Sequence, residues 1–185
     1  MARTIGLGIQ DFKKMVENHY FYIDKTMFIK EWWESGDDVT LLTRPRRFGK
    51  TLALSMLDYF FSVNHRQEQH LFRACSIWQE PALRSLQGTY PVISLSFASI
   101  KETNFQNARD KICQLIASEY ARNTFLLEAG VLSEQEQATF RRKSYDMGDV
   151  DASLSLNQLC EYLCRYYGKK AIILLDEYDT PMQEA

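Results

Sequence analysis

The sequence predicts an α/β fold in which helices flank a parallel sheet. Three observations lead to this prediction. A basic turn ending in Gly49-Lys50-Thr51 lies between an apolar run and a helical pattern. A second apolar run ends in the acidic pair Asp176-Glu177, and strand and helix patterns alternate between these two places. We expect residues 1–185 to form one domain of this class, with a helical insertion at about 98–153.

The chain before the basic turn is expected to be mainly helical. Residues 9–23 indicate a short helix or turn that leads into an extended piece. A helix is predicted over residues 25–35, with Asp24 as its N-cap and Gly36 at its end, because these residue types favour those positions.

The elements around the basic turn begin with a strand predicted over residues 39–43. A helix follows over residues 50–62, and its apolar residues lie on several sides, so it should be largely buried. Residues 91–97 alternate apolar and polar side chains, which is typical of a strand with one buried face.

The second half of the chain shows three helical patterns and one strand. A long helix at about 104–128 carries one apolar stripe, and residues 133–136 form a capping-box pattern that opens a more polar helix. An amphipathic helix is predicted over residues 155–167, with Gly168 at its end. The unbroken apolar run at 171–175 predicts a strand buried on both faces, as in parallel sheets.

The most informative stretch is the basic turn, because a strand, a tight turn ending in Gly-Lys-Thr and a helix form the Walker A geometry of a P-loop nucleoside triphosphatase. Backbone amides of such a turn converge on one point and hold an anion. Lys50 is expected to reach the β- and γ-phosphates, and Thr51 to bind Mg²⁺. The candidate nucleotide-binding residues are Arg44, Pro45, Arg46, Arg47, Phe48, Gly49, Lys50, Thr51 and Leu52.

The turn departs from the usual G-x-x-x-x-G-K-[ST] pattern at its first position, where Arg44 replaces glycine. Pro45 favours an extended Arg44 and removes one amide, although the four cations of the turn add charge that offsets this loss. A solvated basic turn and a nucleic-acid-binding patch remain open as interpretations. Residues 22–26 either line the base pocket or form a packed helix start.

The acidic pair after the second apolar run matches a Walker B motif. Asp176 is expected to hold Mg²⁺, and Glu177 to polarise the attacking water as a general base, so that Glu177 and Lys50 are the candidate catalytic residues. The alternative is a core strand followed by a solvated acidic turn. The nucleotide hypothesis requires the Lys50 ammonium and the Asp176 carboxylate to face each other across one cleft.

Composition excludes several classes of protein. Hydrophobic residues make up 45% and aromatic residues 13% of the chain, which is typical of a folded domain and not of a disordered one. The formal net charge is −2, so no overall positive charge supports nucleic-acid binding. The four cysteines do not suggest a disulfide framework or a zinc site. No membrane span or signal peptide is predicted, and we expect a cytoplasmic protein.

With both motifs placed, the chain resembles the prokaryotic AAA-ATPase-like family over nearly all of residues 5–185. The resemblance implies that Arg44 belongs to the family's own form of the loop, and that the ligands are ATP and Mg²⁺. Similar proteins usually carry a nuclease domain of the PD-(D/E)xK superfamily at their C-terminus. The runs that carry the resemblance are Tyr22-Ile23-Asp24-Lys25-Thr26, Leu42-Thr43-Arg44-Pro45-Arg46-Arg47-Phe48-Gly49-Lys50-Thr51 and Leu175-Asp176-Glu177-Tyr178-Asp179-Thr180-Pro181.

The resemblance also implies structural elements that residues 1–185 do not include. Similar ATPases continue with at least two more strands, and they also have an arginine finger and a lid. One of these strands lies in the sheet between the strands that end here at Thr43 and Leu175. The sequence stops at Ala185, so we expect a domain truncated after the Walker B strand, whose open sheet edge favours self-association. Nucleic acid is then expected as a partner only through a missing nuclease-like domain.

The leading hypothesis is an ATP-binding module that forms the N-terminal part of an ATPase coupled to a nuclease-like effector. Two alternatives remain open. One is a module that senses nucleotide, or acts as a scaffold, without hydrolysis. The other is a nucleic-acid-binding module that uses the basic loop. The sequence does not distinguish ATP from GTP as the ligand. It also leaves open whether residues 1–185 alone hydrolyse that ligand.

Overall fold

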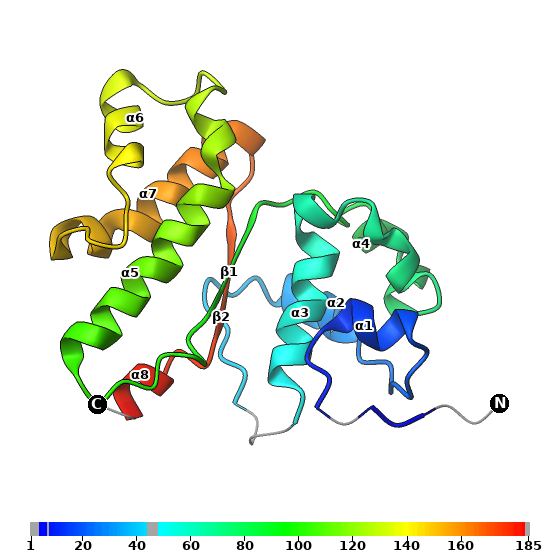
Figure 1. Cartoon of the computed structure of the whole chain (residues 1–185). Helices are drawn as coiled ribbons and strands as arrows, with labels where there is room; N and C mark the ends of the chain where they lie inside the picture. The colour runs from blue at the N-terminus through cyan, green and yellow to red at the C-terminus, as the bar shows by residue number, and fades with distance from the viewer. Residues whose placement is uncertain (1–3, 7, 44–47, 184–185) are drawn as a thin grey trace. The chain divides into compact units, whose positions relative to one another are not determined.

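The computed structural model describes residues 4–6, 8–43 and 48–183. It is an α/β structure in which helices accompany a small sheet of two parallel strands (Figure 1). The chain divides into two compact units, Met1–Val92 and Ile93–Ala185. Within those described ranges, no helix has both the length and the apolar composition that crossing a bilayer requires.

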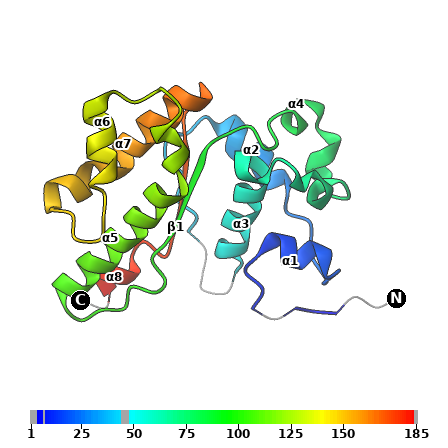
Figure 2. The same ribbon diagram turned by 45° about the horizontal axis from the view of Figure 1, so that its top comes forward.

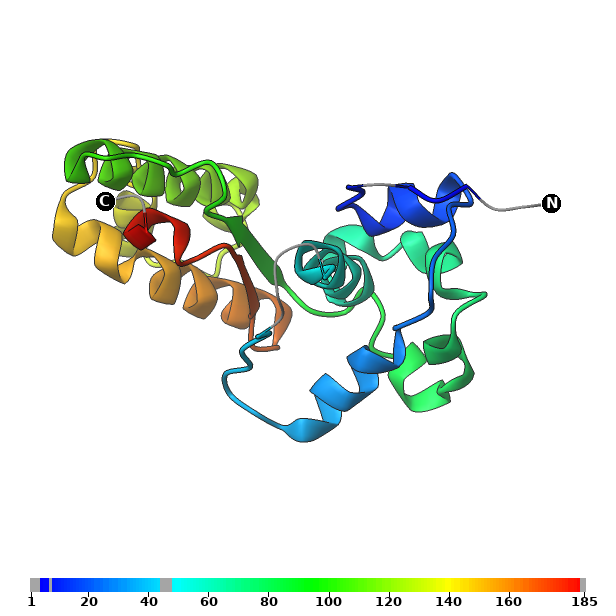
Figure 3. The same cartoon turned by 90° about the horizontal axis from the view of Figure 1, so that it is seen from below.

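The first unit is built from short helices around an aromatic core. Figure 3 looks along its longest helix, α3 (Lys50–Phe61), with α1 (Phe12–Glu17) and α2 (Met27–Ser35) on different sides of it. The Phe72 ring lies 5.1 Å from the rings of both Phe12 and Phe60, so α1, α3 and η2 share one core. The remaining elements are α4 (Pro81–Arg84) and the 3₁₀ helices η1 (Val63–His65), η2 (Glu68–Phe72) and η3 (Ser76–Gln79).

A parallel bridge between Ser62 and Tyr90 fixes the end of α3. The Val63 N–H donates to the Tyr90 carbonyl at 2.9 Å, and the Tyr90 N–H donates to the Phe61 carbonyl at 2.9 Å. Trp33 of α2 packs beside this bridge, with its ring 5.4 Å from Phe61 and 5.2 Å from Tyr90. Backbone pairing and aromatic packing therefore stabilise the same point of the unit.

The sheet is formed by β1 (Val92–Ser96) and β2 (Ile172–Asp176), and apart from Val92 it belongs to the second unit. The two long helices of this unit, α5 and α7, lie side by side (Figure 2), and the Tyr120 hydroxyl of α5 donates to the Ser155 carbonyl of α7 at 2.8 Å. Both helices share their buried core with β1. The elements other than strands are α5 (Phe105–Arg122), η4 (Thr124–Leu127), α6 (Glu134–Arg141), α7 (Asp149–Tyr167) and α8 (Thr180–Gln183).

The local signals for helix starts and ends are largely confirmed. The helix predicted over residues 50–62 is α3. Gly36 and Gly168 end α2 and α7 in the left-handed conformation, as C-cap glycines do. Ser133 and Glu136 form the capping box of α6, in which the Ser133 N–H donates to the Glu136 carboxylate at 2.8 Å.

Two of the three predicted strands are confirmed and one is wrong. The ranges 91–97 and 171–175 correspond to β1 and β2, but residues 39–43 form no strand. This segment is largely exposed, and the Thr43 N–H donates within the segment, to the Leu41 carbonyl at 3.2 Å. A strand is stabilised by hydrogen bonds to a neighbouring strand, and no neighbour pairs with these residues in the part of the chain that the structure describes.

The prediction that the last strand is buried on both faces is also wrong. Leu174 is 5% exposed, whereas Ile173 and Leu175 are 43% and 42% exposed. Successive side chains of a strand point to opposite faces, so this alternation means that only one face of β2 is covered. The apolar run therefore indicated a strand correctly, but not the covering of its second face.

The helix predicted over residues 155–167 begins earlier, at Asp149 in α7. The Lys143 ammonium donates to the carbonyl and to the carboxylate of Asp151, both at 2.9 Å. Nε of Arg109 donates to the Asp149 carboxylate at 2.6 Å. These cations stabilise the acidic first turn of α7 and extend the helix beyond its apolar pattern.

Candidate functional site

A cavity of about 250 Å³ lies in the first unit, beside the start of α3. Its described lining comes from α1, α2 and α3, from the segment before α2, and from Leu42, Phe48 and Gly49, which precede α3. Most lining side chains are aromatic or aliphatic, among them Phe21, Tyr22, Phe28, Leu52 and Met56. Mostly apolar cavities with a few polar groups are where proteins bind small molecules.

Gly49 sets the direction of the chain as it enters α3. It is the N-cap residue, with φ 77 and ψ 27 in the left-handed region, and as a glycine it supplies no side-chain cap to the helix. A Cβ added here would meet nothing within 4 Å, so glycine is favoured for its backbone conformation and not for space. The first N–H groups of a helix have no acceptor within the helix, and together with the helix dipole they favour an anion at this end.

Two lysines line the cavity: Lys50, the first residue of α3, and Lys25, just before α2. Among the described residues, neither ammonium has a hydrogen bond or an ion pair, and no lining side chain is a carboxylate. The cavity thus combines apolar walls with two cations that its described lining does not neutralise. This combination suits a ligand with a flat apolar part and an anionic part.

Asp24 holds the cavity wall between Tyr22 and Lys25 in place. One of its carboxylate oxygens accepts hydrogen bonds from the N–H and the hydroxyl of Thr26, at 2.8 and 2.7 Å. The other accepts from the N–H and the hydroxyl of Ser76, at 2.6 and 2.7 Å. The prediction of Asp24 as the N-cap of α2 is therefore wrong: Thr26 takes that position, and Asp24 connects the segment to η3.

The same hydrogen bonds keep Asp24 ionised. Partial burial favours the neutral acid, but the donors of Thr26 and Ser76 outweigh it, so the pKa of Asp24 lies below its usual value. The carboxylate is thus engaged by the protein's own scaffold. Within the described structure it forms no ion pair with Lys25, its neighbour in sequence.

Tyr22 connects this wall with α1 and α3. Its hydroxyl accepts a hydrogen bond from the Lys25 N–H at 3.2 Å and lies 3.7 Å from the Met56 sulfur, to which it donates. Its ring meets the Phe12 ring edge-on at 5.7 Å. Burial raises the pKa of Tyr22 to about 12, so the phenol is neutral near pH 7. The segment is both a packed helix start and a wall of the cavity.

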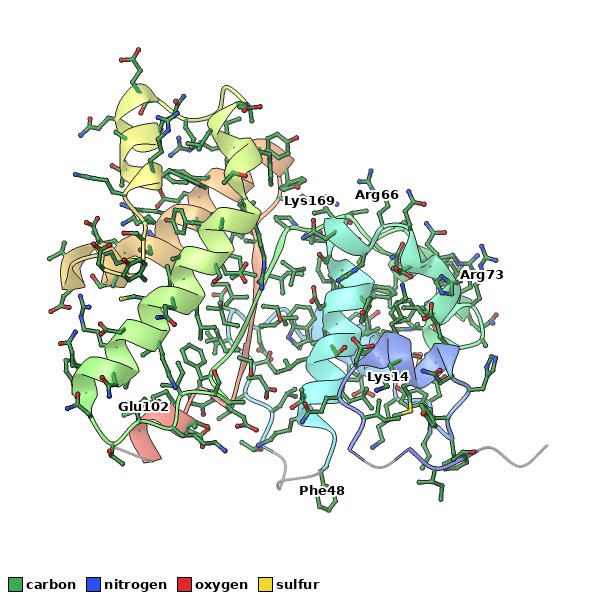
Figure 4. All side chains as sticks on the ribbon, in the orientation of Figure 1. Lys14, Phe48, Arg66, Arg73, Glu102 and Lys169 are labelled. Carbon is green, nitrogen blue, oxygen red and sulfur yellow. The ribbon has the colours of Figure 1, made fainter. Side chains whose placement is uncertain are left out.

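The predicted nucleotide-binding residues fall into three groups. Phe48, Gly49, Lys50 and Leu52 line the cavity, and the Phe48 side chain, which is 62% exposed, projects from the start of α3 (Figure 4). Thr51 lies in the first turn of α3. The residues that lie outside the described part of the chain are Arg44, Pro45, Arg46 and Arg47.

The predicted metal ligand Asp176 and the predicted base Glu177 lie in the second unit, at the carboxyl end of β2. The Asp176 carbonyl accepts the Phe97 N–H at 2.9 Å, which joins the ends of the two strands. Glu177 has φ 50, in the left-handed region that is unfavourable for a residue with a Cβ. The Thr180 N–H donates to the Glu177 carbonyl at 3.0 Å, and this turn leads into α8. Lys50 belongs to the first unit, so each half of the predicted site is described within its own unit.

Three further side chains of the first unit have the spacing of metal ligands. Ligand atoms of Glu17, Glu68 and His70 lie within 4.8 Å of one another. The Lys13 ammonium, however, donates to Glu68 at 2.7 Å and holds the pKa of that carboxyl below its usual value. His70 Nε2 lies 3.1 Å from a Glu17 oxygen. The group is therefore an ion-pair network at the surface, in which Lys13 supplies the positive charge.

Sequence reasoning missed most of the apolar wall of the cavity. Met15, Phe28 and Met56 come from three different helices, and their periodicity alone indicates core positions. Lys25 belongs to residues 22–26, which the sequence left open as a wall of the base pocket, but no role of its ammonium was predicted.

Comparison with known proteins agrees with the sequence motifs. No solved structure is significantly similar to the chain. An uncharacterized protein of the vnfD 5′ region of Azotobacter chroococcum mcd 1 is 28% identical over 181 residues, which cover 97% of this chain and 30% of that protein. The chain thus spans less than a third of the length of this relative. A family model described as Predicted AAA-ATPase matches residues 6–185, and the chain therefore belongs to that family.

Proposed function

We propose that this chain binds ATP together with Mg²⁺ as a P-loop module. The observation that carries the proposal is the cavity at the start of α3, which joins aromatic walls to two lysines without an acid in its described lining. The adenine would lie between the apolar walls, and the phosphates would meet Lys50 and the first amides of α3. Membership of the Predicted AAA-ATPase family supports nucleotide binding in general.

Adenine fits this lining better than guanine does. Guanine presents N–H donors on its Watson–Crick edge, and a protein that selects it offers acceptors, most effectively a carboxylate. The described lining has no carboxylate, and the nearby Asp24 already accepts four hydrogen bonds from Thr26 and Ser76. We therefore propose ATP, and not GTP, as the ligand.

The remaining roles follow the motifs. Thr51 and Asp176 would hold Mg²⁺, and Glu177 would act as the base that polarises the attacking water. The left-handed backbone of Glu177 supports a functional role, because unfavourable backbone conformations are concentrated at functional sites. In this proposal residues 1–185 act as one module, with the helices at about 98–153 as an insertion.

The test is calorimetric titration of MgATP into the wild-type chain, Lys50→Ala and Glu177→Gln. Lys50→Ala should weaken binding by about 100-fold, because it removes a charge-assisted contact to the phosphates. Glu177→Gln should bind normally, because the proposed base acts on water. Lys14→Ala, which changes an exposed lysine of α1 outside the described lining, is the control. Equal binding by wild type and Lys50→Ala would refute the proposal.

A second candidate function is nucleotide sensing without hydrolysis. The specific observation in its favour is that the entire described lining of the cavity comes from the first unit, so the contacts proposed for the base and for Lys50 need no residue of the second unit. Phosphate release distinguishes the two functions. Turnover that is lost in Glu177→Gln, with binding retained, would establish hydrolysis, and binding without turnover would favour sensing.

Coupling to an effector is proposed only for a longer protein, since the chain spans 30% of its relative. A nuclease-like domain of the PD-(D/E)xK superfamily is the effector that we propose, and nucleic acid would contact that domain. Self-association through the edge of β2 is proposed for residues 1–185 themselves, in whose described part only β1 pairs with β2.

A further inference from the structure

We propose that Lys25 is a second phosphate-binding cation, which acts with Lys50 on the polyphosphate of the bound nucleotide. This inference rests on the proposed function and adds to it a residue outside the phosphate-loop motif. Lys25 lies in the segment before α2, whereas Lys50 is the first residue of α3, and both line the same cavity.

The first observation is that the surroundings of Lys25 differ from those of Lys13 and Lys30. Lys13 donates to Glu68 at 2.7 Å, and Lys30 donates to Glu80 at 2.9 Å. The Lys25 ammonium has no such partner among the residues that the structure describes. Its nearest acid in sequence, Asp24, is engaged by Thr26 and Ser76, so the cavity wall carries a cation that the surrounding scaffold does not neutralise.

The second observation is that the backbone of Lys25 is fixed on both sides. Its N–H donates to the Tyr22 hydroxyl at 3.2 Å, and its carbonyl accepts the Phe28 N–H at 3.0 Å. The Asp24 hydrogen bonds tie the same segment to η3. A lysine on a fixed backbone loses only side-chain freedom when it binds a ligand, and this lowers the entropic cost of the contact.

The chemistry of lysine suits a ligand that carries several phosphates. A lysine ammonium is a compact point charge that suits phosphate oxygens, and charge-assisted hydrogen bonds are stronger than neutral ones. A second cation matters most for a ligand with several negative charges. Lys25 should therefore contribute to binding of ATP and ADP, less to AMP, and nothing to adenosine.

The experiment compares Lys25→Met with the wild-type chain in titrations of MgATP, MgADP, AMP and adenosine. Methionine keeps the length and apolar stem of lysine but removes the charge. We expect MgATP to bind about tenfold more weakly, and adenosine to bind as it does to wild type. Lys25→Arg should recover most of the affinity. Lys14→Met is the matched control on α1, and thermal unfolding of each variant verifies folding.

Each alternative outcome has a definite meaning. If Lys25→Met binds MgATP as tightly as wild type while Lys50→Ala does not, the inference on Lys25 is overturned and the proposed function stands. If Lys25→Met loses adenosine and MgATP affinity to the same extent, Lys25 shapes the wall and does not bind phosphate, which also overturns it. If the wild-type chain binds none of these nucleotides, the proposed function itself fails.

Discussion

The helices α3 and α7 both begin at a glycine that supplies no side-chain cap, yet their surroundings at this end are opposite. The first turn of α7 carries Asp149 and Asp151, and Arg109 and Lys143 pair with them. The first turn of α3 carries no acid. The N-terminus of α7 thus has acids of its own chain, whereas the first turn of α3 has none, which suits the anionic ligand that we propose.

The lysines at these two places show the same contrast. The Lys143 side chain is completely buried and donates to Asp151, whose pKa it holds below the usual value. Lys50 lines a cavity and has no ion pair among the described residues. A buried cation needs its partner in the folded chain, whereas a cation at a cavity is a candidate for binding a ligand. The start of α3, and not that of α7, therefore has the features of a candidate binding site.

The largest expected effect on stability is at α7. Asp151→Ala should lower the free energy of unfolding by about 2 kcal/mol, because it leaves the buried Lys143 ammonium without its carboxylate partner. Urea denaturation measures this change. Asp149→Ala is the matched control, since that side chain is 84% exposed and its loss should cost less than about 0.5 kcal/mol. If both variants lowered the free energy of unfolding equally, the predicted difference between Asp151 and Asp149 would be wrong.

The next effect concerns the two N-cap glycines. Gly49→Ala should lower the free energy of unfolding by about 1 kcal/mol, because alanine is unfavourable at φ 77. Gly148→Ala should leave stability unchanged or slightly higher, because φ is −68 there and a Cβ would meet nothing within 4 Å. Urea titrations of both variants at one pH test the difference. A tolerated Gly49→Ala would show that the entry to α3 can adopt another backbone conformation.

The smallest effect is the pH dependence that Asp24 gives to the first unit. Its pKa is lower in the folded chain than in the unfolded one, so its contribution to stability is present near pH 7 and is lost as the pH falls below about 4. Asp24→Asn should therefore be less stable than wild type at pH 7, and the difference should shrink towards pH 3. Unfolding at several pH values measures it, and a difference that grows on acidification would contradict the assignment.

Features that depend on neighbours in sequence were predictable. The capping box at Ser133 and the C-cap glycine Gly168 need only local hydrogen bonds and backbone freedom. Residues 39–43 and the second face of β2 were not, because pairing and covering come from segments far away in the chain. Apolar runs indicate a tendency to form strands and do not reveal what pairs with them.

In the candidate site, too, local features were predictable and features that depend on distant residues were not. Gly49 and Lys50 were found from a local motif, and both line the cavity. The role of Asp24 was not predictable, since its second pair of hydrogen bonds reaches Ser76, which is 52 positions away. Lys25 lies in the segment 22–26 that the sequence left open as a pocket wall, but its lack of a partner among the described residues is a property of the folded chain.

The conformation of Glu177 has a consequence for protein engineering. Glycine at this position would avoid the steric cost of φ 50, which is on the order of 1 kcal/mol for other residues, so Glu177→Gly is the kind of change that a thermostability screen selects. Such a variant would melt at a higher temperature and lose the carboxylate at the end of β2. If that carboxylate performs chemistry, heat resistance and turnover are in direct competition at a single residue.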